Sequence, residues 1–304
     1  MTVEIDLTEK KIELKNLLKE QTYLLSVIAA VLIWSVSFVA TKVAFHTIPP
    51  LTLGALRFVF AAIILGSVLL VQHRLILPKP GDLLRMAVSG ILGITIYFSM
   101  ENIGVKLATA ADAALIVASY PAITMLLETV FYRMRISWIR FLGVGLAILG
   151  VYLIVLESSN ISGAQRFTGD LILAVAGIVW SFYNFITRKV VNKYPTFLIT
   201  FYQTVAGAIA FLPLAWMEWK EWQVPTLNSM VALLYLSVFC SVIAFLLYAN
   251  GLRKLSSSSA VTVMNLVPVF GVLFAVLFLH EPLSGIQFIG GIVVIFGIML
   301  SVRQ

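Results

Sequence analysis

Residues 34–42 read WSVSFVATK, and residues 180–188 read WSFYNFITR. Both stretches begin with Trp-Ser and end with a threonine followed by a cationic residue, at a displacement of about 146 residues. Further matches at nearly the same displacement pair Pro50 with Pro195, Pro121 with Pro268, Gly143 with Gly290, and Gly150 with Gly297. Matches in one register along both halves indicate that the chain is built from an internal repeat.

The repeat lies in a chain that is far more apolar than a water-soluble protein. Of its 304 residues, 61% are hydrophobic and 12% are charged, against about 45–50% and about 25% in typical soluble domains. A membrane-crossing helix needs about 20 mostly apolar residues. Ten such runs cover residues 23–45, 51–71, 83–105, 109–132, 138–156, 169–190, 195–216, 229–252, 257–279 and 284–302. Because runs of this length must satisfy their backbone hydrogen bonds internally, the sequence predicts an all-α polytopic membrane protein.

The ten predicted helices divide into two sets of five. We expect a cytoplasmic N-terminal segment at 1–22, a first repeat at 23–156, an external linker at 157–168 and a second repeat at 169–302. Because five is odd, the second repeat enters the membrane from the opposite side. The expected fold is therefore ten transmembrane helices arranged as two inverted five-helix repeats.

The positive charge sets the expected orientation. A net charge of +7 with a pI near 9.5 would suggest a nucleic-acid partner for a soluble domain, but membrane proteins keep lysine and arginine on the cytoplasmic side. With a cytoplasmic N-terminus, sixteen of these residues fall inside and four outside, and Arg57 lies within a span. We expect a multi-pass protein of the plasma or inner membrane with both termini cytoplasmic. Its partners would be the lipid bilayer and a small-molecule substrate, without nucleic acid.

Several features together resemble a known family. They are the 5+5 arrangement, the Trp-Ser motif in the first span of each half, the mid-helix prolines, and the segment FLHEPL at 278–283 followed by Gly290 and Gly297. This combination, over roughly residues 23–302, resembles the EamA-like branch of the drug/metabolite transporter superfamily. Members of that superfamily move amino acids, amines, nucleotide sugars and other metabolites, often outward. Family repeats commonly close with a glutamate, which is present as Glu281 in the second half and replaced by Met134 in the first.

Inverted repeats are typical of secondary transporters, whose substrate site lies between the repeats and opens to each side in turn. We therefore expect alternating access by a carrier for a small polar or amphipathic metabolite, with proton coupling as one option. Aromatic residues in the spans favour amino acids or related amines, because cations bind aromatic faces; outward transport follows from the resemblance. The alternatives are a multidrug exporter and an exchanger of nucleotide sugars or organic phosphates, which would normally need several deep cations.

Other function classes find less support in the sequence. The hydrolase and metalloprotease signatures and the Walker A motif are missing, so an intramembrane enzyme is not expected. Filter-like glycine-rich loops and rings of charge, which would favour a channel, are not seen. Cys240 is the single cysteine and lies in an apolar run, which excludes disulfides and thiolate metal sites. We expect neither a metal nor a cofactor.

Polar and aromatic side chains within the apolar spans are the candidates for a substrate site. Spacing places four residues of the first span on one face, and four residues of the sixth take the same repeat positions. The two sets are Trp34, Ser37, Phe38 and Thr41, and Trp180, Tyr183, Asn184 and Thr187. We expect the two stripes to oppose each other across a central axis; the alternative is ordinary interhelical packing. The candidate substrate-binding residues are Trp34, Ser37, Thr41, Tyr97, Glu101, Tyr120, Trp180, Tyr183, Asn184, Tyr248 and Asn265.

Three ionisable residues, Arg57, Glu101 and Asp112, are expected in the outer half of their spans and form a candidate charge network. One hypothesis is that Glu101 or Asp112 binds a substrate ammonium or a coupling proton, while Arg57 tunes the acid or holds a substrate carboxylate. The alternative is a fixed ion pair that locks two helices together.

Prolines and glycines give two further hypotheses. Pro121 and Pro268 interrupt the fourth and ninth spans and are candidate helix-break or gating points, because a proline frees a backbone carbonyl. The glycines at 143, 150, 290 and 297 permit close helix contact, either within the chain or in a homodimer.

Overall fold

The computed structural model describes residues 2–132, 137–161, 164–251, 263–264 and 266–302. The regular elements of this part of the chain are all helices. Eight helical stretches are long and apolar enough to cross a membrane, and two shorter apolar helices, Leu266–Leu279 and Gly285–Ser301, follow them. The predicted all-α fold with two repeats is confirmed.

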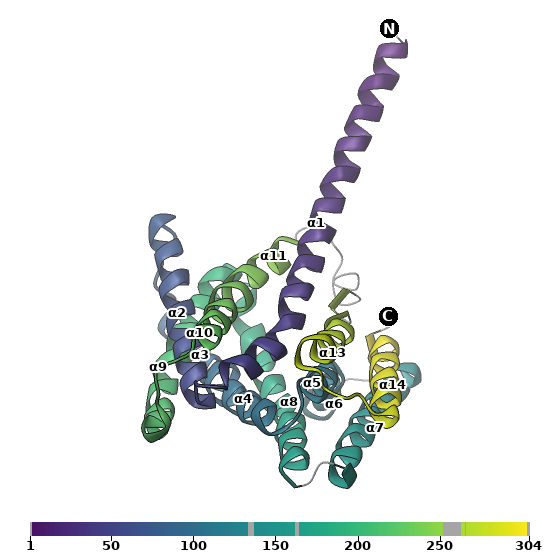
Figure 1. Cartoon of the computed structure of the whole chain (residues 1–304). Helices are drawn as coiled ribbons and strands as arrows, with labels where there is room; N and C mark the ends of the chain where they lie inside the picture. Colours follow the sequence, from purple (N-terminus) through teal and green to yellow (C-terminus); the bar gives the residue numbers. More distant parts are fainter. Residues whose placement is uncertain (1, 133–136, 162–163, 252–262, 265, 303–304) are drawn as a thin grey trace.

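The first repeat contains five helical spans, two of which are interrupted (Figure 1). The third span consists of two α-helices joined by a π-helical segment, and the fourth is broken at Ser119. The elements are α1 (Thr2–Ala44), α2 (Pro50–Val71), α3 (Pro80–Gly90), the π-helical segment Ile91–Ile96, α4 (Tyr97–Leu107), α5 (Ala110–Ala118), α6 (Tyr120–Tyr132) and α7 (Trp138–Ile161).

The second repeat follows the same plan. Its third span again carries a π-helical segment between two α-helices. The elements are α8 (Ala164–Val191), α9 (Thr196–Met217), a 3-10 turn (Trp219–Glu221), α10 (Leu227–Leu234), the π-helical segment Tyr235–Ile243, α11 (Ala244–Gly251), α13 (Leu266–Leu279) and α14 (Gly285–Val302).

Two helices extend beyond the apolar spans that they contain. The first span begins at Thr22, close to the expected start, and α1 continues through the segment 2–22 as the same helix. That segment is rich in lysine, glutamate and leucine, which favour helix, and it holds neither glycine nor proline. The fifth span ends at Leu156, and α7 continues to Ile161 and α8 begins at Ala164, within the expected linker 157–168.

Helix starts are set by local sequence signals. Pro50 and Pro80 occupy the first turn of α2 and α3, where the missing N–H of proline costs no helical hydrogen bond. Thr109 caps α5, because its Oγ1 accepts a hydrogen bond from the Asp112 backbone N at 3.0 Å. Thr226 caps α10 in the same way.

The two ends of the molecule can be told apart by following the chain. We term the end at which α7 passes into α8 the linker side, and the opposite end, toward which α1 projects, the terminal side (Figure 1). Chain order then places the start of α5 and α14 on the linker side. It places the start of α3 and α9 on the terminal side.

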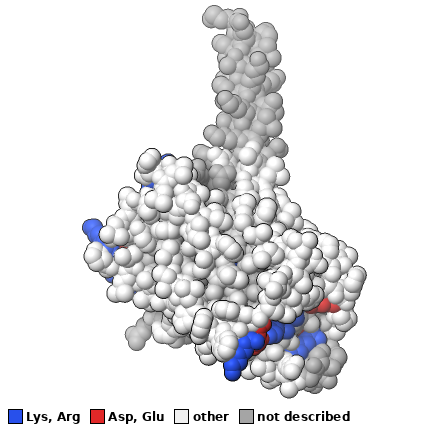
Figure 2. All heavy atoms as spheres, turned by 60° about the vertical axis from the view of Figure 1, so that its left-hand side comes forward, with Lys and Arg blue, Asp and Glu red and all other residues white. Residues whose placement is uncertain are grey.

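The flanks of the helix bundle expose large apolar side chains, for example Ile63, Leu212 and Ile292. Figure 2 shows one face with a broad area free of charged residues and with lysine, arginine, aspartate and glutamate near its edges. Such a surface would be unfavourable in water and suits contact with lipid. The chain is therefore a multi-pass membrane protein.

The π-helical segments lie at matching positions of the two repeats, each in the middle of a third span. The one in the first repeat packs tightly against α9. Thr95 Oγ1 donates to the Gly207 backbone O at 2.8 Å, and a Cβ added to Gly207 would lie 2.5 Å from the Cβ of Ile94. π-helical segments within α-helices occur frequently at functional sites, so their repetition marks the third spans as elements of interest.

Glycines join α7 to α14. A Cβ added at Gly150 would lie 2.6 Å from the Gly290 backbone O, and one added at Gly290 would lie 3.0 Å from the Gly150 backbone O. Gly143 meets Gly297 in the same way further along the helices. These glycines therefore form a helix contact within the chain. A homodimer stays a prediction that would need another surface.

Candidate functional site

Trp34 of α1 packs against the third span of the second repeat. Its indole Nε1 donates to the Cys240 backbone O at 3.0 Å, within the second π-helical segment. Its ring lies 5.3 Å from that of Phe245 and 5.6 Å from that of Tyr248, centroid to centroid. The tryptophan of the first repeat is thus anchored to the second.

Trp180 of α8 makes the complementary contact with the third span of the first repeat. Its ring centroid lies 4.9 Å from those of both Tyr97 and Tyr183, and Tyr97 in turn lies 6.0 Å from Tyr120. Each aromatic stripe is therefore joined to the third span of the other repeat. Among the described residues, no ring contact joins the stripe of Trp34 directly to that of Trp180, as opposition across an axis would have suggested.

The remaining polar residues of the stripes are held close to their own helices. Ser37 Oγ donates to the Trp34 backbone O at 2.6 Å, and Asn184 Nδ2 donates to the Trp180 backbone O at 3.0 Å. Both side chains are half-buried, whereas Thr41 is buried. Asn265 lies outside the described residues.

Gln203 of α9 is a buried polar residue that the sequence patterns did not single out. Its Nε2 donates to Ser89 Oγ and to Thr187 Oγ1, both at 2.9 Å. Its Oε1 accepts from the Tyr183 hydroxyl at 3.5 Å. The sequence offers one indication of this residue, namely a glutamine side chain within an otherwise apolar span. A buried amide costs free energy unless it is hydrogen-bonded.

Tyr120 and Pro121 lie at the break between α5 and α6. The Tyr120 hydroxyl donates to the Leu173 backbone O of α8 at 2.8 Å, which fixes this side chain between the repeats. The helix is interrupted at Ser119, just before the proline. Pro268 is buried in the first turn of α13.

Arg57 and Glu101 are two buried charges that do not form an ion pair in the described structure. Arg57 Nε donates to Ser241 Oγ at 2.9 Å, and its guanidinium carbon lies 4.7 Å from the ring centroid of Phe98 and 5.2 Å from that of Phe58. Glu101 interacts with the Tyr97 hydroxyl and, through charge, with Arg57. A carboxylate and a guanidinium are thus held near each other by aromatic and hydroxyl groups.

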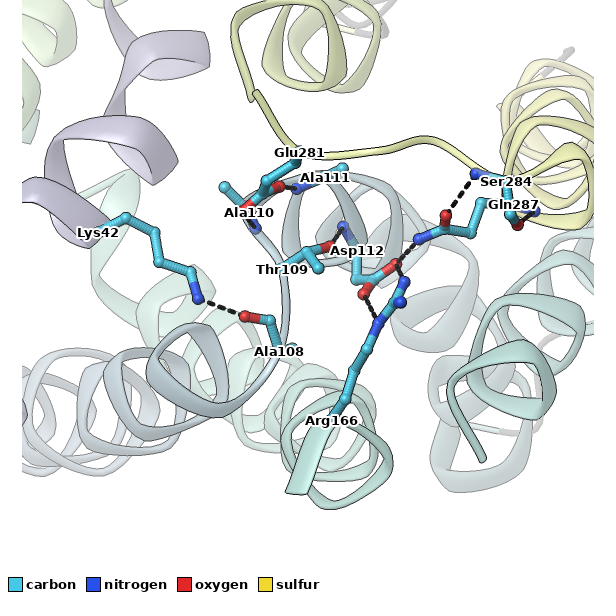
Figure 3. Close-up of polar contacts among 10 residues, drawn as sticks. All are labelled: Lys42, Ala108, Thr109, Ala110, Ala111, Asp112, Arg166, Glu281, Ser284 and Gln287. Carbon is cyan, nitrogen blue, oxygen red and sulfur yellow. Dashed lines mark hydrogen bonds and ion pairs between the residues drawn. The ribbon is translucent and has the colours of Figure 1, made fainter. Parts of the chain in front are cut away.

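Asp112 belongs to a different cluster from Arg57 and Glu101 (Figure 3). Its Oδ2 accepts from Arg166 Nε at 2.7 Å, and its Oδ1 accepts from Arg166 Nη2 at 3.1 Å and from Gln287 Nε2 at 2.5 Å. The predicted three-residue network is therefore divided, because the partner of Asp112 is Arg166 rather than Arg57. In the sequence, Arg166 is one of the four cationic residues expected outside, and Gln287 belongs to no pattern that suggests a site.

Two further side chains contact the start of α5 and the residue just before it (Figure 3). The Glu281 carboxylate accepts from the backbone N of Ala110 at 2.9 Å and of Ala111 at 3.0 Å, where the positive end of the helix dipole favours an anion. Lys42 Nζ donates to the Ala108 backbone O. We term Lys42, Asp112, Arg166, Glu281 and Gln287 the linker-side cluster.

The terminal side carries its own ion pairs. Asp82 of α3 accepts from Lys193 Nζ of the second repeat at 2.8 Å and from Arg85 Nη1 of its own helix at 2.6 Å. Arg188 of α8 pairs with Glu128 of α6. Among the described residues, no group of three or more histidine, cysteine, aspartate or glutamate side chains could hold a metal ion.

Together these elements define a helical membrane protein made of two inverted repeats that exchange aromatic contacts through their third spans. The profile of the EamA-like transporter family matches the chain twice, over residues 21–156 and 167–303. The chain therefore belongs to the EamA-like transporter family.

Individual relatives agree with this assignment. An "uncharacterized transporter" of Archaeoglobus fulgidus is 29% identical over 290 residues, covering 94% of this chain and 99% of its own. A "probable terminal-alkyne amino-acid exporter" of Streptantibioticus cattleyicolor is 25% identical over 281 residues, covering 92% and 93%. One crystal structure resembles the fold with a TM-score of 0.65 at 21% identity, over 92% of this chain and 96% of that one. The chain is a transporter of this family.

Proposed function

We propose that this transporter exports amino acids or related amines across the cell membrane by alternating access, with protons as the coupling ion. The observation that carries the proposal is the buried Glu101 carboxylate beside Tyr97, within the aromatic contacts of Tyr97, Tyr120 and Trp180. A buried carboxylate beside a group of aromatic rings can attract an ammonium group, because both the negative charge and the ring faces favour a cation.

Glu101 also fits the role of proton carrier. An ionised carboxylate inside a membrane costs several kcal/mol unless it is paired or hydrated. A carboxylate without an ion-pair partner among the described residues therefore gains most from binding either a proton or a substrate ammonium. Competition between these two cations for one carboxylate would couple substrate release to proton entry.

Arg57 supports an amino acid over a simple amine as the substrate. Its guanidinium donates a hydrogen bond to the uncharged Ser241 and has no acidic partner within ion-pair distance among the described residues. Arginine binds carboxylates through two parallel hydrogen bonds. Arg57 and Glu101 together would therefore receive the carboxylate and the ammonium of one zwitterion.

Two further arguments support the choice of substrate and direction. The relative from Streptantibioticus cattleyicolor is named as a probable exporter of an amino acid. Phosphate-bearing substrates usually require several deep cations, whereas Arg166 is already committed to Asp112. In this proposal the linker side faces outward and both termini face the cytoplasm, as the distribution of lysine and arginine favours.

The experiment is counterflow into liposomes that contain the purified protein. Vesicles are preloaded with one unlabelled solute from a panel of amino acids, their decarboxylated amines, organic phosphates and lipophilic cations, and the labelled solute is added outside. We expect accumulation for amino acids, and a change in rate when a pH gradient is imposed. Accumulation of only a phosphate or only a lipophilic cation would refute the proposed substrate class.

A further inference from the structure

The linker-side cluster ties the two repeats together at one turn of α5. Asp112 at this turn binds Arg166 of α8 and Gln287 of α14, and Glu281, just before α14, binds the backbone of the same turn. Lys42 adds α1 through the Ala108 carbonyl. Asp170, one turn beyond Arg166, adds a further charge that interacts with Arg166 and Lys42. The α5 turn is thus the common partner of side chains from both repeats.

The burial of this cluster distinguishes it from the ion pairs on the terminal side. The Asp112 side chain is 0% exposed and that of Arg166 is 13% exposed. On the terminal side the carboxylates of Glu128 and Asp82 are 13% and 7% exposed, but their partners Arg188 and Lys193 are 62% and 48% exposed. Ion pairs with an exposed partner contribute little, because water competes for the exposed charge. Separating a buried carboxylate from its partners costs much more, since the charge must be rehydrated.

The sequence contains the same asymmetry. The register that pairs Pro121 with Pro268 places Ser259 at the position of Asp112 and Met134 at the position of Glu281. Both of these counterparts lie outside the described residues, and neither carries a charge. In sequence, the two carboxylates of the linker-side cluster therefore have uncharged counterparts in the other repeat.

We infer that the linker-side cluster is a latch that closes the outer end of the transport path, with Asp112 as its central residue. The terminal side has no equivalent latch among the described residues, only pairs whose cations are exposed. Opening toward the linker side requires Asp112 to leave Arg166 and Gln287, so this step controls release of the substrate outside. The inference rests on alternating access from the proposed function but not on the identity of the substrate.

The latch is tested by chemical labelling from the linker side. Thr41 is buried on α1 next to Lys42, so a single cysteine is placed there by Thr41→Cys in a Cys240→Ala background. The initial rate of reaction with a membrane-impermeant maleimide is then measured with and without Asp112→Asn. We expect Asp112→Asn to increase this rate by about tenfold or more, because it shifts the population toward the state open on the linker side.

The matched control is Asp82→Asn on the terminal side, which should leave the labelling rate unchanged or lower it. Arg166→Lys should give an intermediate rate, because lysine keeps the charge and loses the two-point geometry.

If Asp112→Asn does not yield folded protein by size-exclusion chromatography, Gln287→Leu supplies the same test by removing one bond to Asp112. Equal rates for the folded variants and the parent would overturn the latch. An unexpected substrate in the counterflow assay would refute the proposed function and leave this result standing.

Discussion

Arg57 of α2 donates a hydrogen bond to Ser241 at 2.9 Å and thereby joins the first repeat to the π-helical segment of the second. The hydroxyl of Ser241 in turn donates to the Leu236 backbone O at 3.0 Å, within the same segment. A π-helical turn leaves backbone carbonyls without their usual α-helical partners. The hydroxyl that holds Arg57 is therefore oriented by the irregular backbone, which positions the guanidinium without neutralising it.

Replacing Arg57 should affect the transport of amino acids and of amines differently. We expect Arg57→Gln to reduce exchange of an α-amino acid by about tenfold or more, because the carboxylate loses its charged partner, and to leave exchange of the decarboxylated amine nearly unchanged. Counterflow with both substrates measures the ratio. Lys106→Gln, which removes an exposed cation at the end of α4, is the matched control. Equal loss for both substrates would indicate a purely structural role for Arg57.

Replacing Glu101 removes the pH dependence. A proton bound outside and released inside should drive substrate outward, so acid on the linker side accelerates efflux from vesicles that carry the native carboxylate. Glu101→Gln cannot exchange this proton, and we expect efflux that is slow and indifferent to the gradient. Glu221→Gln, at a carboxylate that is 62% exposed, should respond to the gradient as the native protein does. A gradient response that survives in Glu101→Gln would assign the proton to another group.

The α7–α14 contact predicts a difference between two glycines of one helix. Gly150→Ala should lower the free energy of unfolding by about 1–3 kcal/mol, because the added Cβ meets the α14 backbone. Gly145→Ala adds a methyl group where nothing lies within 4 Å and should not destabilise the protein. Thermal unfolding in detergent measures both. Equal midpoints for the two variants would contradict the close helix contact.

Much of the fold could be predicted from the sequence because it depends on long-range periodicity. Runs of apolar residues give the spans, and the Trp-Ser motif with the displaced prolines and glycines gives the repeat. The π-helical segments could not be predicted, since they arise from packing such as that of Ile94 against Gly207. The apolar spans begin and end close to the expected positions, as at Thr22 and Leu156, whereas the continuation of α1 and α7 as helix beyond those spans has no signal in hydropathy.

The residue types of the site could be predicted from the sequence, but most of the contacts between these residues could not. The spacing identifies Trp34, Tyr97 and Trp180 as candidates. In the structure, Tyr97 contacts Trp180, whereas Trp34 contacts the third span of the second repeat. The pairing of Asp112 with Arg166 could not be read from depth along the spans. It depends on how α8 and α14 approach the start of α5, which one sequence does not specify.

The measurement that tests carrier function most directly is the effect of internal substrate on the entry of the same labelled substrate. In a carrier whose site opens to one side at a time, unlabelled amino acid inside the vesicles binds the inward-open site. The site then turns outward with this amino acid bound and can take up labelled substrate again. We predict that labelled entry saturates with concentration and accelerates severalfold with internal amino acid. Entry that rises in proportion to concentration and ignores the internal amino acid would contradict alternating access and indicate a pore.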